Sequence, residues 1–244
     1  MKILALDSTA TTATVALCED ERLIGLYTLN SGSTQSETLL PMVESLLKLL
    51  GLTVDDIDMF ACAKGPGSFT GVRIGAATVK GLAFGTDKPC IGVSTLEALA
   101  ANLIGLVGDD AILCPVMNAR RGQVYNALFR MTDGKLTRIC EDRALSIQEL
   151  ETELIKYQLP VYLCGDGYDV TLKGMTQLTV AQTPELMRYQ NAYSVATVAL
   201  EAYRNGERTT DAELTPSYLR LPQAERERNE RLAREASESN RNKN

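Results

Sequence analysis

The stretch KILALDSTATTATVALCEDERLIGLYT, residues 2–28, decides the fold class of this chain. It holds three strand-like apolar runs, at residues 2–6, 12–17 and 23–28, and polar turn residues separate them. We expect these runs to form an antiparallel meander. An ordinary doubly wound sheet does not begin in this way, because its parallel strands need crossover connections from the start.

Helices and strands alternate after the meander. The apolar spacing predicts, in order, a helix over residues 34–50, a strand over 59–63, a helix over 70–84, a strand over 89–93 and a helix over 94–104. Capping-box sequences begin the helices at Thr34 and Ser94. A meander followed by alternating elements in one sheet is typical of an actin/hexokinase-like (ASKHA) lobe, so we predict an α/β, two-lobed fold with mixed sheets flanked by helices.

A turn at Gly105–Asp110 is the candidate boundary between the lobes. The first lobe is then residues 1–106, which carries the partner-binding helices, and the second is residues 107–220. In the second lobe we expect strands over 111–117, 124–131 and 160–164 and helices over 146–157 and 192–203. The last helix, counted to residue 205, could pack back on the first lobe. The charged tail, residues 221–244, is too poor in apolar residues to order itself, with a partner-binding arm as the alternative.

Composition excludes several classes of function. Histidine is absent from the 244 residues, which rules out Ser-His-Asp and Cys-His mechanisms and His-containing zinc sites. The formal charge of −6 argues against a broad nucleic-acid-binding surface. No apolar run approaches the ~20 residues of a membrane helix. Six separate cysteines without a CxxC pair indicate buried thiols in a reducing compartment, so we expect a cytoplasmic protein that begins at or near Met1.

The segment from Gly65 to Gly75, GPGSFTGVRIG, joins a strand to a helix and has two interpretations. Gly65, Gly67 and Ser68 could hold a phosphate at the N-terminus of the helix. The alternative is a tight connection that needs glycine for conformational reasons. The segment is neither a Walker A loop nor a GxGxxG fingerprint, so the residues leave both interpretations open.

Two further turns are candidate parts of a nucleotide site. Asp7 and Ser8 follow the first strand, and a carboxylate there can order Mg²⁺ water around a nucleotide. Gly165 begins a Gly-Asp-Gly turn after a strand of the second lobe, which could close such a site. In both turns the alternative is that side chains and glycines only satisfy the backbone, and it is the favoured one.

Several motifs together resemble the TsaB family, formerly called YeaZ. They cover most of the chain and lie at Leu4–Thr9, Gln35–Pro41, Gly65–Gly75, Ile91–Leu99, Asn118–Tyr125 and Pro216–Arg220. Two positions depart from the family pattern. Asn118 stands where Asp is more frequent, and Gln35 stands where many members have His. These changes speak against an acidic or metal-binding role at either position.

The resemblance implies a bacterial protein that pairs with TsaD, the enzyme that attaches a threonylcarbamoyl group to the adenosine next to certain tRNA anticodons. TsaE, an ATPase, completes that system. TsaD carries a His-based metal site and this chain has no histidine, so the implied role is a non-catalytic, essential partner without a metal. We expect that the chain itself requires no cofactor. ATP or ADP would bind at the partner or at the complex interface, and tRNA would bind only through the complex.

The expected mechanism is heterodimer formation through the helices at residues 34–50 and 70–84, and the same surface could form a homodimer of the isolated chain. The candidate contacts are Leu39, Leu40, Val43, Leu47, Val72, Ile74, Ala77 and Leu82. The main alternative is a self-contained nucleotide-dependent phosphotransferase or ATPase of the ASKHA superfamily that uses Asp7 and the glycine loop at residues 65–75. The family was once described as protease-like, but this sequence has no recognisable nucleophile–base pair for such an activity.

Overall fold

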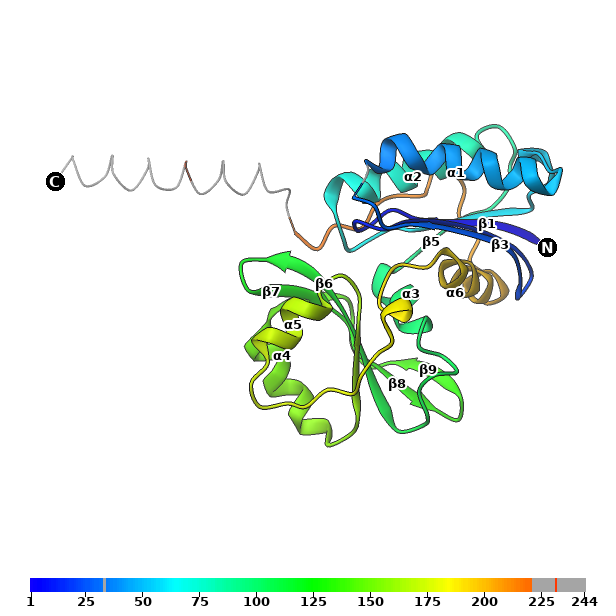
Figure 1. The fold of residues 1–244 in the computed structure, drawn as a ribbon. Coiled ribbons are helices and arrows are strands. Elements are labelled where there is room, and N and C mark those ends of the chain that lie inside the picture. Colours follow the sequence, from blue (N-terminus) through cyan, green and yellow to red (C-terminus); the bar gives the residue numbers. More distant parts are fainter. Residues whose placement is uncertain (33, 221–230, 232–244) are drawn as a thin grey trace.

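The computed structural model describes residues 1–32, 34–220 and 231, so the predicted tail lies, apart from Arg231, outside the described residues. The chain folds into two lobes, each built on a sheet (Figure 1). The sheet of the first lobe has the strand order β3-β2-β1-β4-β5. Its strands are β1 (Lys2–Asp7), β2 (Ala13–Glu19), β3 (Arg22–Leu29), β4 (Met59–Ala63) and β5 (Cys90–Val93).

The predicted meander is confirmed. β1 pairs antiparallel with β2, and β2 pairs antiparallel with β3, whereas β4 lies parallel to both β1 and β5. This mixed sheet, with helices on both faces, is the α/β, actin/hexokinase-like architecture expected from the sequence.

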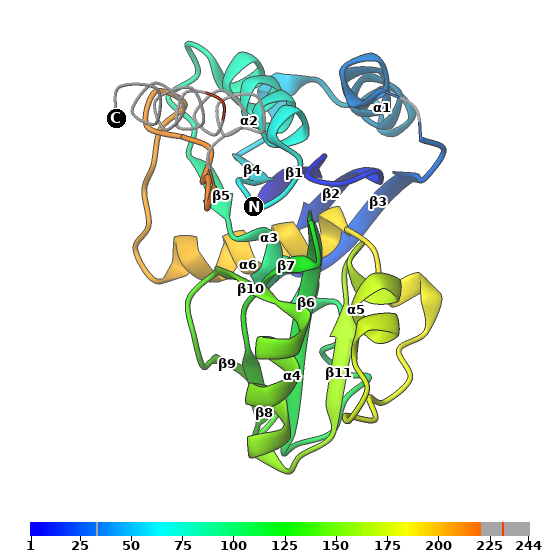
Figure 2. The ribbon, with the colours of Figure 1, turned by 90° about the vertical axis from the view of Figure 1, so that its left-hand side faces the viewer.

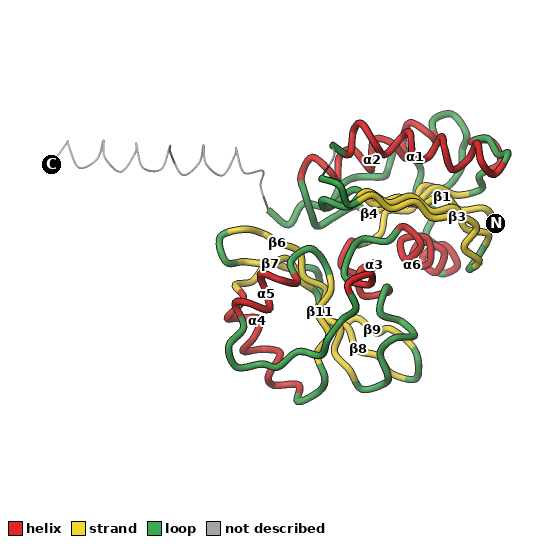
Figure 3. The backbone as a smooth tube through the Cα atoms, viewed as in Figure 1, coloured by secondary structure: helices red, strands yellow, loops and turns green. Residues whose placement is uncertain are grey.

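Helices cover the two faces of the first sheet (Figure 3). On one face lie α1 (Gln35–Leu50) and α2 (Phe69–Ala83), with the short 3₁₀ turn Val54–Asp56 before β4. On the other face lies α6 (Ala192–Arg204), whose buried side chains pack against β1, β4 and β5. The first sheet is therefore covered on its second face by a helix from the far end of the chain.

The capping boxes predicted at two helix starts are not fully formed. At Thr34 no side-chain hydrogen bond caps α1, so that prediction is wrong. At Ser94 half of the box is present, because the hydroxyl accepts from the Glu97 amide. The Glu97 carboxylate accepts from Arg138 in the second lobe instead, at 2.7 Å. A partner distant in sequence thus displaces the local contact.

The second lobe is built around the long strand β6 (Ala111–Arg120). Its other strands are β7 (Gln123–Asn126), β8 (Phe129–Thr132), β9 (Lys135–Arg138), β10 (Arg143–Ser146) and β11 (Val161–Cys164). Its helices are α4 (Ile147–Leu154) and α5 (Tyr168–Gly174), with 3₁₀ turns at Ile155–Tyr157 and Glu185–Met187. β11 runs parallel to β6, and β7, β8, β9 and β10 complete the antiparallel part.

The single strand predicted over residues 124–131 is divided into β7 and β8. Both segments follow one antiparallel register along β6, with Val116 opposite Asn126 and Leu113 opposite Phe129. The break falls across from Pro115, which has no amide hydrogen for the ladder. The Leu128 amide donates to the Cys140 Sγ at 3.2 Å instead. The local proline, rather than a turn, explains the interruption.

Helix α3 (Thr95–Ala101) lies between the lobes, beside α6 (Figure 2). Leu96 and Leu99 pack into the core of the second lobe, together with β6 and β8. Ala98, on the other side of the same helix, packs into the core that α6 shares with the first sheet. One helix thus belongs to the cores of both lobes.

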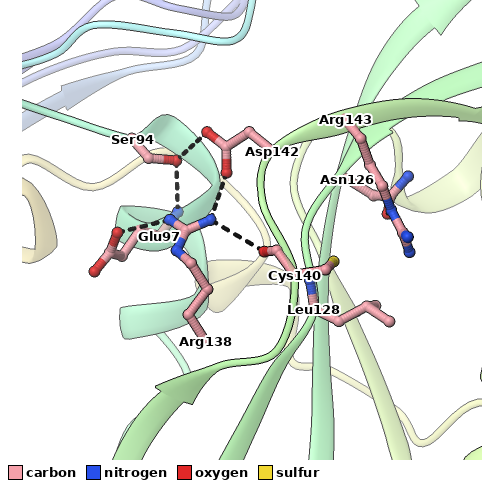
Figure 4. A network of polar contacts seen from close by, with 8 residues as sticks. All are labelled: Ser94, Glu97, Asn126, Leu128, Arg138, Cys140, Asp142 and Arg143. Carbon is pink, nitrogen blue, oxygen red and sulfur yellow. Dashed lines mark hydrogen bonds and ion pairs between the residues drawn. The ribbon is translucent and has the colours of Figure 1, made fainter.

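A clasp of polar contacts also joins the lobes, and we use that name for Ser94, Glu97, Arg138 and Asp142 (Figure 4). The Arg138 guanidinium donates to Glu97 and to Asp142, each at 2.7 Å, and lies 4.6 Å from the centre of the Phe129 ring. The Ser94 hydroxyl donates to the second oxygen of Asp142 at 2.6 Å. The clasp therefore ties the start of α3 to the segment between β9 and β10.

The six cysteines are free thiols, and all except Cys140 are buried. Cys90 follows Lys88 and Pro89 in the sequence, and burial raises the pKa of its thiol to about 11. Its role as a small core residue is thereby favoured. Among the residues that the structure describes, none of the helices has both the length and the apolar character to cross a membrane.

Candidate functional site

A cleft of about 700 Å³ lies between the lobes. One wall is formed by the loop after β1 and by the start of α2, and the opposite wall by the end of β6 and by Asp166. A third wall is formed by residues 217–220, which follow the last helix. The cleft thus gathers the three turns that the sequence singled out.

Glycines of the segment between β4 and α2 allow other parts of the backbone to come close. A Cβ on Gly67 would lie 2.5 Å from the Thr9 carbonyl oxygen, and one on Gly71 would overlap the carbonyl oxygen of Ser8. Gly65 has a φ of 113°, and a Cβ there would overlap the Ser217 carbonyl oxygen. The glycines therefore serve close packing between segments distant in sequence.

Polar groups of the same loops bind one another. The Ser68 amide donates to the Thr9 carbonyl oxygen at 2.7 Å, and the Ser8 hydroxyl donates to the Gly71 carbonyl oxygen at 2.9 Å. The Ser68 hydroxyl accepts from the Gly71 amide at 3.3 Å and so caps α2. These contacts favour the conformational interpretation of Ser8 and Ser68, because the Ser8 hydroxyl and the Ser68 amide already donate to carbonyl oxygens of the chain.

Asp7 is buried at the end of β1 beside the cleft. Its Oδ1 accepts from the amide and the hydroxyl of Thr9, at 2.8 and 2.7 Å. Its Oδ2 has no hydrogen-bond partner within the described residues. Burial raises the pKa of Asp7 to about 6, with a smaller contribution from the charge of Asp166. Burial likewise raises the pKa of Asp166 to about 6.

The fold would allow a nucleotide in this cleft, but the loops do not fit its phosphates. The amide of Gly165 donates to the Arg188 carbonyl oxygen at 2.5 Å, and that of Gly167 donates to the Val116 carbonyl oxygen at 3.0 Å. Together with the Ser68 amide, these donors are turned toward the chain itself. A phosphate would also meet the carboxyl groups of Asp7 and Asp166, which repel it when ionised. No chemical step is therefore assigned to this cleft.

The predicted partner contacts divide into inward and outward residues. Leu39, Val43, Leu47 and Val72 are at most 5% exposed and pack in the core of the first lobe. They are not available to another chain, which corrects the prediction for these four. The helical spacing of these apolar residues is present as predicted, but it marks the helix faces that cover the chain's own sheet.

The other four predicted contacts reach the surface. Leu40 on α1 is 43% exposed, and Ala77 on α2 is exposed. Ile74 and Leu82 are half-buried and pack against the core beneath the two helices. Phe84, directly after α2, was not among the predicted contacts and is 80% exposed. The outer surface of the α1–α2 layer therefore carries accessible apolar side chains.

The positions that depart from the family pattern have structural partners. Gln35 Nε2 donates to the Ala10 carbonyl oxygen at 2.6 Å, which fixes the loop after β1 to the start of α1. Asn118 is exposed, and its Oδ1 accepts from the Arg120 amide at 2.8 Å within the β6–β7 turn. Both side chains thus hold loops beside the cleft.

The C-terminal segment, residues 214–220, is the part of the site that sequence reasoning missed. The Ser217 amide donates to the Lys64 carbonyl oxygen at 2.6 Å, and the Tyr218 ring lies 4.8 Å from that of Phe69. Arg220 donates to the Ala119 carbonyl oxygen at 3.2 Å and to the Gln123 side chain. The segment therefore bridges both lobes at the mouth of the cleft, and the motif Pro216–Arg220 was the available signal.

Comparison with known proteins gives consistent matches. A family model described as TsaD, tRNA N6-adenosine threonylcarbamoyltransferase, matches residues 31–228. The tRNA threonylcarbamoyladenosine biosynthesis protein TsaB of Bacillus subtilis is 32% identical over 226 residues, which cover 92% of this chain and 96% of that protein. The match therefore extends over nearly the whole of both chains.

Solved structures agree with the sequence matches. A protein from Pseudomonas aeruginosa described as similar to peptidase YeaZ has a TM-score of 0.78 at 28% identity, and covers 90% of this chain and 99% of its own. A second structure, YeaZ from the same organism, has a TM-score of 0.73 at 27% identity, with 89% and 99% covered. The two-lobed arrangement is thus shared along the full length.

Proposed function

This chain belongs to the TsaB family of tRNA threonylcarbamoyladenosine biosynthesis proteins, and from that premise we propose that it acts as the non-catalytic, essential partner of TsaD. In this proposal it binds TsaD as a heterodimer and supports formation of threonylcarbamoyladenosine next to the anticodon. TsaE joins the system as the ATPase, and the site of action is the cytoplasm. The isolated chain forms a homodimer through the same surface.

The observation that carries the proposal is the accessible apolar surface of the α1–α2 layer. Leu40, Ala77 and Phe84 are exposed there, while the opposite faces of the helices are covered by the chain's own sheet. Large exposed apolar side chains on a rigid layer are typical of protein interfaces. Ile74 and Leu82, which are half-buried, would form the edge of the contact.

We assign no cofactor to this chain within the proposal. The loop amides of the cleft donate to its own carbonyl groups, and the Asp7 carboxylate accepts twice from Thr9. ATP or ADP is expected at TsaD or at the complex interface instead. The alternative, a self-contained ATPase, draws its support from the second oxygen of Asp7, which lacks a partner among the described residues.

The test is reconstitution of tRNA threonylcarbamoylation from TsaD and TsaE, with and without this chain. We expect modification only when the chain is present, and loss of both modification and heterodimer with Leu40→Arg and with Ala77→Arg. Lys135→Ala, on the exposed β8–β9 hairpin of the second lobe, is the matched control and should behave as wild type. Modification that proceeds equally well without the chain would contradict the proposal. ATP hydrolysis by the isolated chain that Asp7→Ala abolishes would favour the alternative.

A further inference from the structure

Three segments without acidic residues, 59–86, 111–132 and 214–220, each contribute residues to the lining of the cleft. Their charged side chains are all basic: Lys64, Arg73, Lys80, Arg120, Arg121, Arg130, which pairs with Asp110, and Arg220. The chain as a whole has a net charge of −6, so the basic character of these segments is a local feature. A positive region on an acidic protein attracts anionic partners despite the overall charge.

Contacts between aromatic rings and guanidinium groups connect these segments. The Arg73 guanidinium lies 5.1 Å from the centre of the Phe69 ring, which stacks at 4.8 Å on Tyr218. Two residues further on, Arg220 lies 5.8 Å from the centre of the Tyr125 ring. We call this set, together with Arg120 and Arg121 of the β6–β7 turn, the Arg–aromatic rim. Its members Phe69, Arg120, Tyr125, Tyr218 and Arg220 line the cleft between the lobes.

The rim is accessible from solvent. Arg73, Arg120 and Arg121 are exposed, and Tyr218 is 45% exposed. Within residues 1–32 and 34–220, the carboxyl group that lines the same cleft is that of Asp166, which is half-buried. Cationic groups and one face of an aromatic ring are thus presented together on the surface.

We propose that the Arg–aromatic rim binds single-stranded RNA, as found in the loop of a tRNA, with arginines on phosphates and Tyr218 stacked on a base. The inference rests on the proposed function, which brings tRNA to the complex, but it adds a direct contact that this chain makes. Interleaved arginines and aromatic rings favour RNA over an acidic peptide, because bases offer faces for stacking and peptides of Asp and Glu do not.

The rim adjoins the proposed TsaD surface on α2. Residues four apart lie on the same side of a helix, so Ala77 is a neighbour of Arg73, whereas Ile74 is turned about 100° from Arg73 and packs on the core of the first lobe. Lys80, on the flank of Arg73, donates to the Leu214 carbonyl oxygen at 3.2 Å. The remaining rim residues belong to the β6–β7 turn and the C-terminal segment, so TsaD binding is measured beside RNA binding for each variant.

The experiment measures binding of a fluorescently labelled tRNA anticodon stem-loop to the full chain, alone and with TsaD, across a salt series. Substituting Arg73→Ala, Arg120→Ala and Arg121→Ala together should lower the affinity about tenfold or more, and should reduce the slope of log affinity against log salt by about 2, because three phosphate contacts are lost. Lys135→Ala, Lys156→Ala and Lys173→Ala together remove the same charge from exposed sites of the second lobe and should change the affinity less than about twofold.

Substitutions at Tyr218 test base stacking separately from the charge of the arginines. Tyr218→Ala should lower the affinity for the stem-loop about fivefold or more without changing the salt slope, and Tyr218→Phe should bind as wild type does.

Equal binding by wild type and the arginine variant, or equal loss in the lysine control, would overturn the inference. So would displacement of the RNA by poly-glutamate as effectively as by unlabelled stem-loop. Loss of TsaD binding together with RNA binding would assign the rim to the protein interface, while modification that still depends on the chain would leave the proposed function intact.

Discussion

Two regions of the interlobe cleft lie side by side but use their polar groups differently. They are the loops that contain Asp7, Ser68 and Gly165, which we call the floor, and the Arg–aromatic rim. On the floor, the loops of Asp7, Ser68 and Gly165 direct their amides and hydroxyls to the chain's own carbonyl and carboxyl oxygens. On the rim, Arg73, Arg120 and Tyr218 reach solvent. A glycine-rich loop that resembles a phosphate cradle can thus serve close internal packing, while the groups able to bind an external partner lie outside it.

The largest expected effect tests the packing of the floor. Gly71→Ala places a methyl group against the Ser8 carbonyl oxygen, which belongs to buried backbone and cannot move aside. We expect the free energy of unfolding to fall by about 3 kcal/mol and the melting temperature by about 10 °C. Thermal and denaturant unfolding of the purified protein measure both.

Gly81 is the matched control, because it lies in the same helix with no atom within 4 Å of an added Cβ. Gly81→Ala should leave stability unchanged or raise it by roughly 0.5–1 kcal/mol. If the two variants were equally stable, close packing would not explain the glycine at position 71. The interpretation of residues 65–75 as a phosphate-binding loop would then regain support.

A smaller effect is expected from the buried carboxyl group. The pKa of Asp7 is raised from 3.8 to about 6 in the folded protein, so the folded state binds the proton more tightly than the unfolded state. The contribution of this group to stability is fully present below about pH 4 and is lost as the pH rises to about 6. Asp7→Asn removes the titration and keeps an oxygen that can accept from Thr9. We therefore expect the variant to be more stable than wild type by roughly 2 kcal/mol at neutral pH.

Unfolding of both proteins between pH 4 and pH 8 measures the difference. It should be near zero at the acidic end, grow through the interval up to about pH 6 and remain constant above it. A variant that is less stable than wild type at neutral pH would mean that the ionised carboxylate stabilises the floor, as a bound cation would require.

The smallest expected effect concerns the clasp. Arg138→Ala removes two ion pairs and a cation–π contact that are partly shielded from solvent. Since Glu97 is 38% exposed, screening limits the loss to about 1 kcal/mol. Arg130→Ala breaks one exposed pair with Asp110 and should cost less than about 0.5 kcal/mol. Equal effects in denaturant unfolding would show that the clasp adds nothing beyond a surface ion pair.

Much of the fold follows from local patterns in the sequence. The alternation in residues 2–28 predicted the meander, and the apolar run Met59–Ala63 predicted β4 at its observed bounds. The helical spacing after Thr34 predicted α1 but could not tell which surface it covers, because periodicity marks an apolar face and not its partner. Leu39 and Val43 were therefore assigned to another protein, although they pack on the chain's own sheet.

The site was less predictable, since its contacts join residues far apart in the sequence. Nothing near Gly71 reveals that its neighbour is Ser8, and nothing near Glu97 reveals that Arg138 will displace its capping contact. The absence of acidic residues around Arg73 and Arg120 was visible in the sequence, but only the fold brings these segments together at the cleft. The overall charge of −6 hid a local basic surface.

Helix α3 has a consequence for how this protein can be divided. A fragment that ended at residue 106 would leave Leu96 and Leu99 without the β6 and β8 side chains that cover them, and the first sheet without α6. A fragment that began after that point would lack the helix that fills its own core. The two lobes are therefore architectural units but not autonomous folding units, and the chain is expected to fold as a single unit.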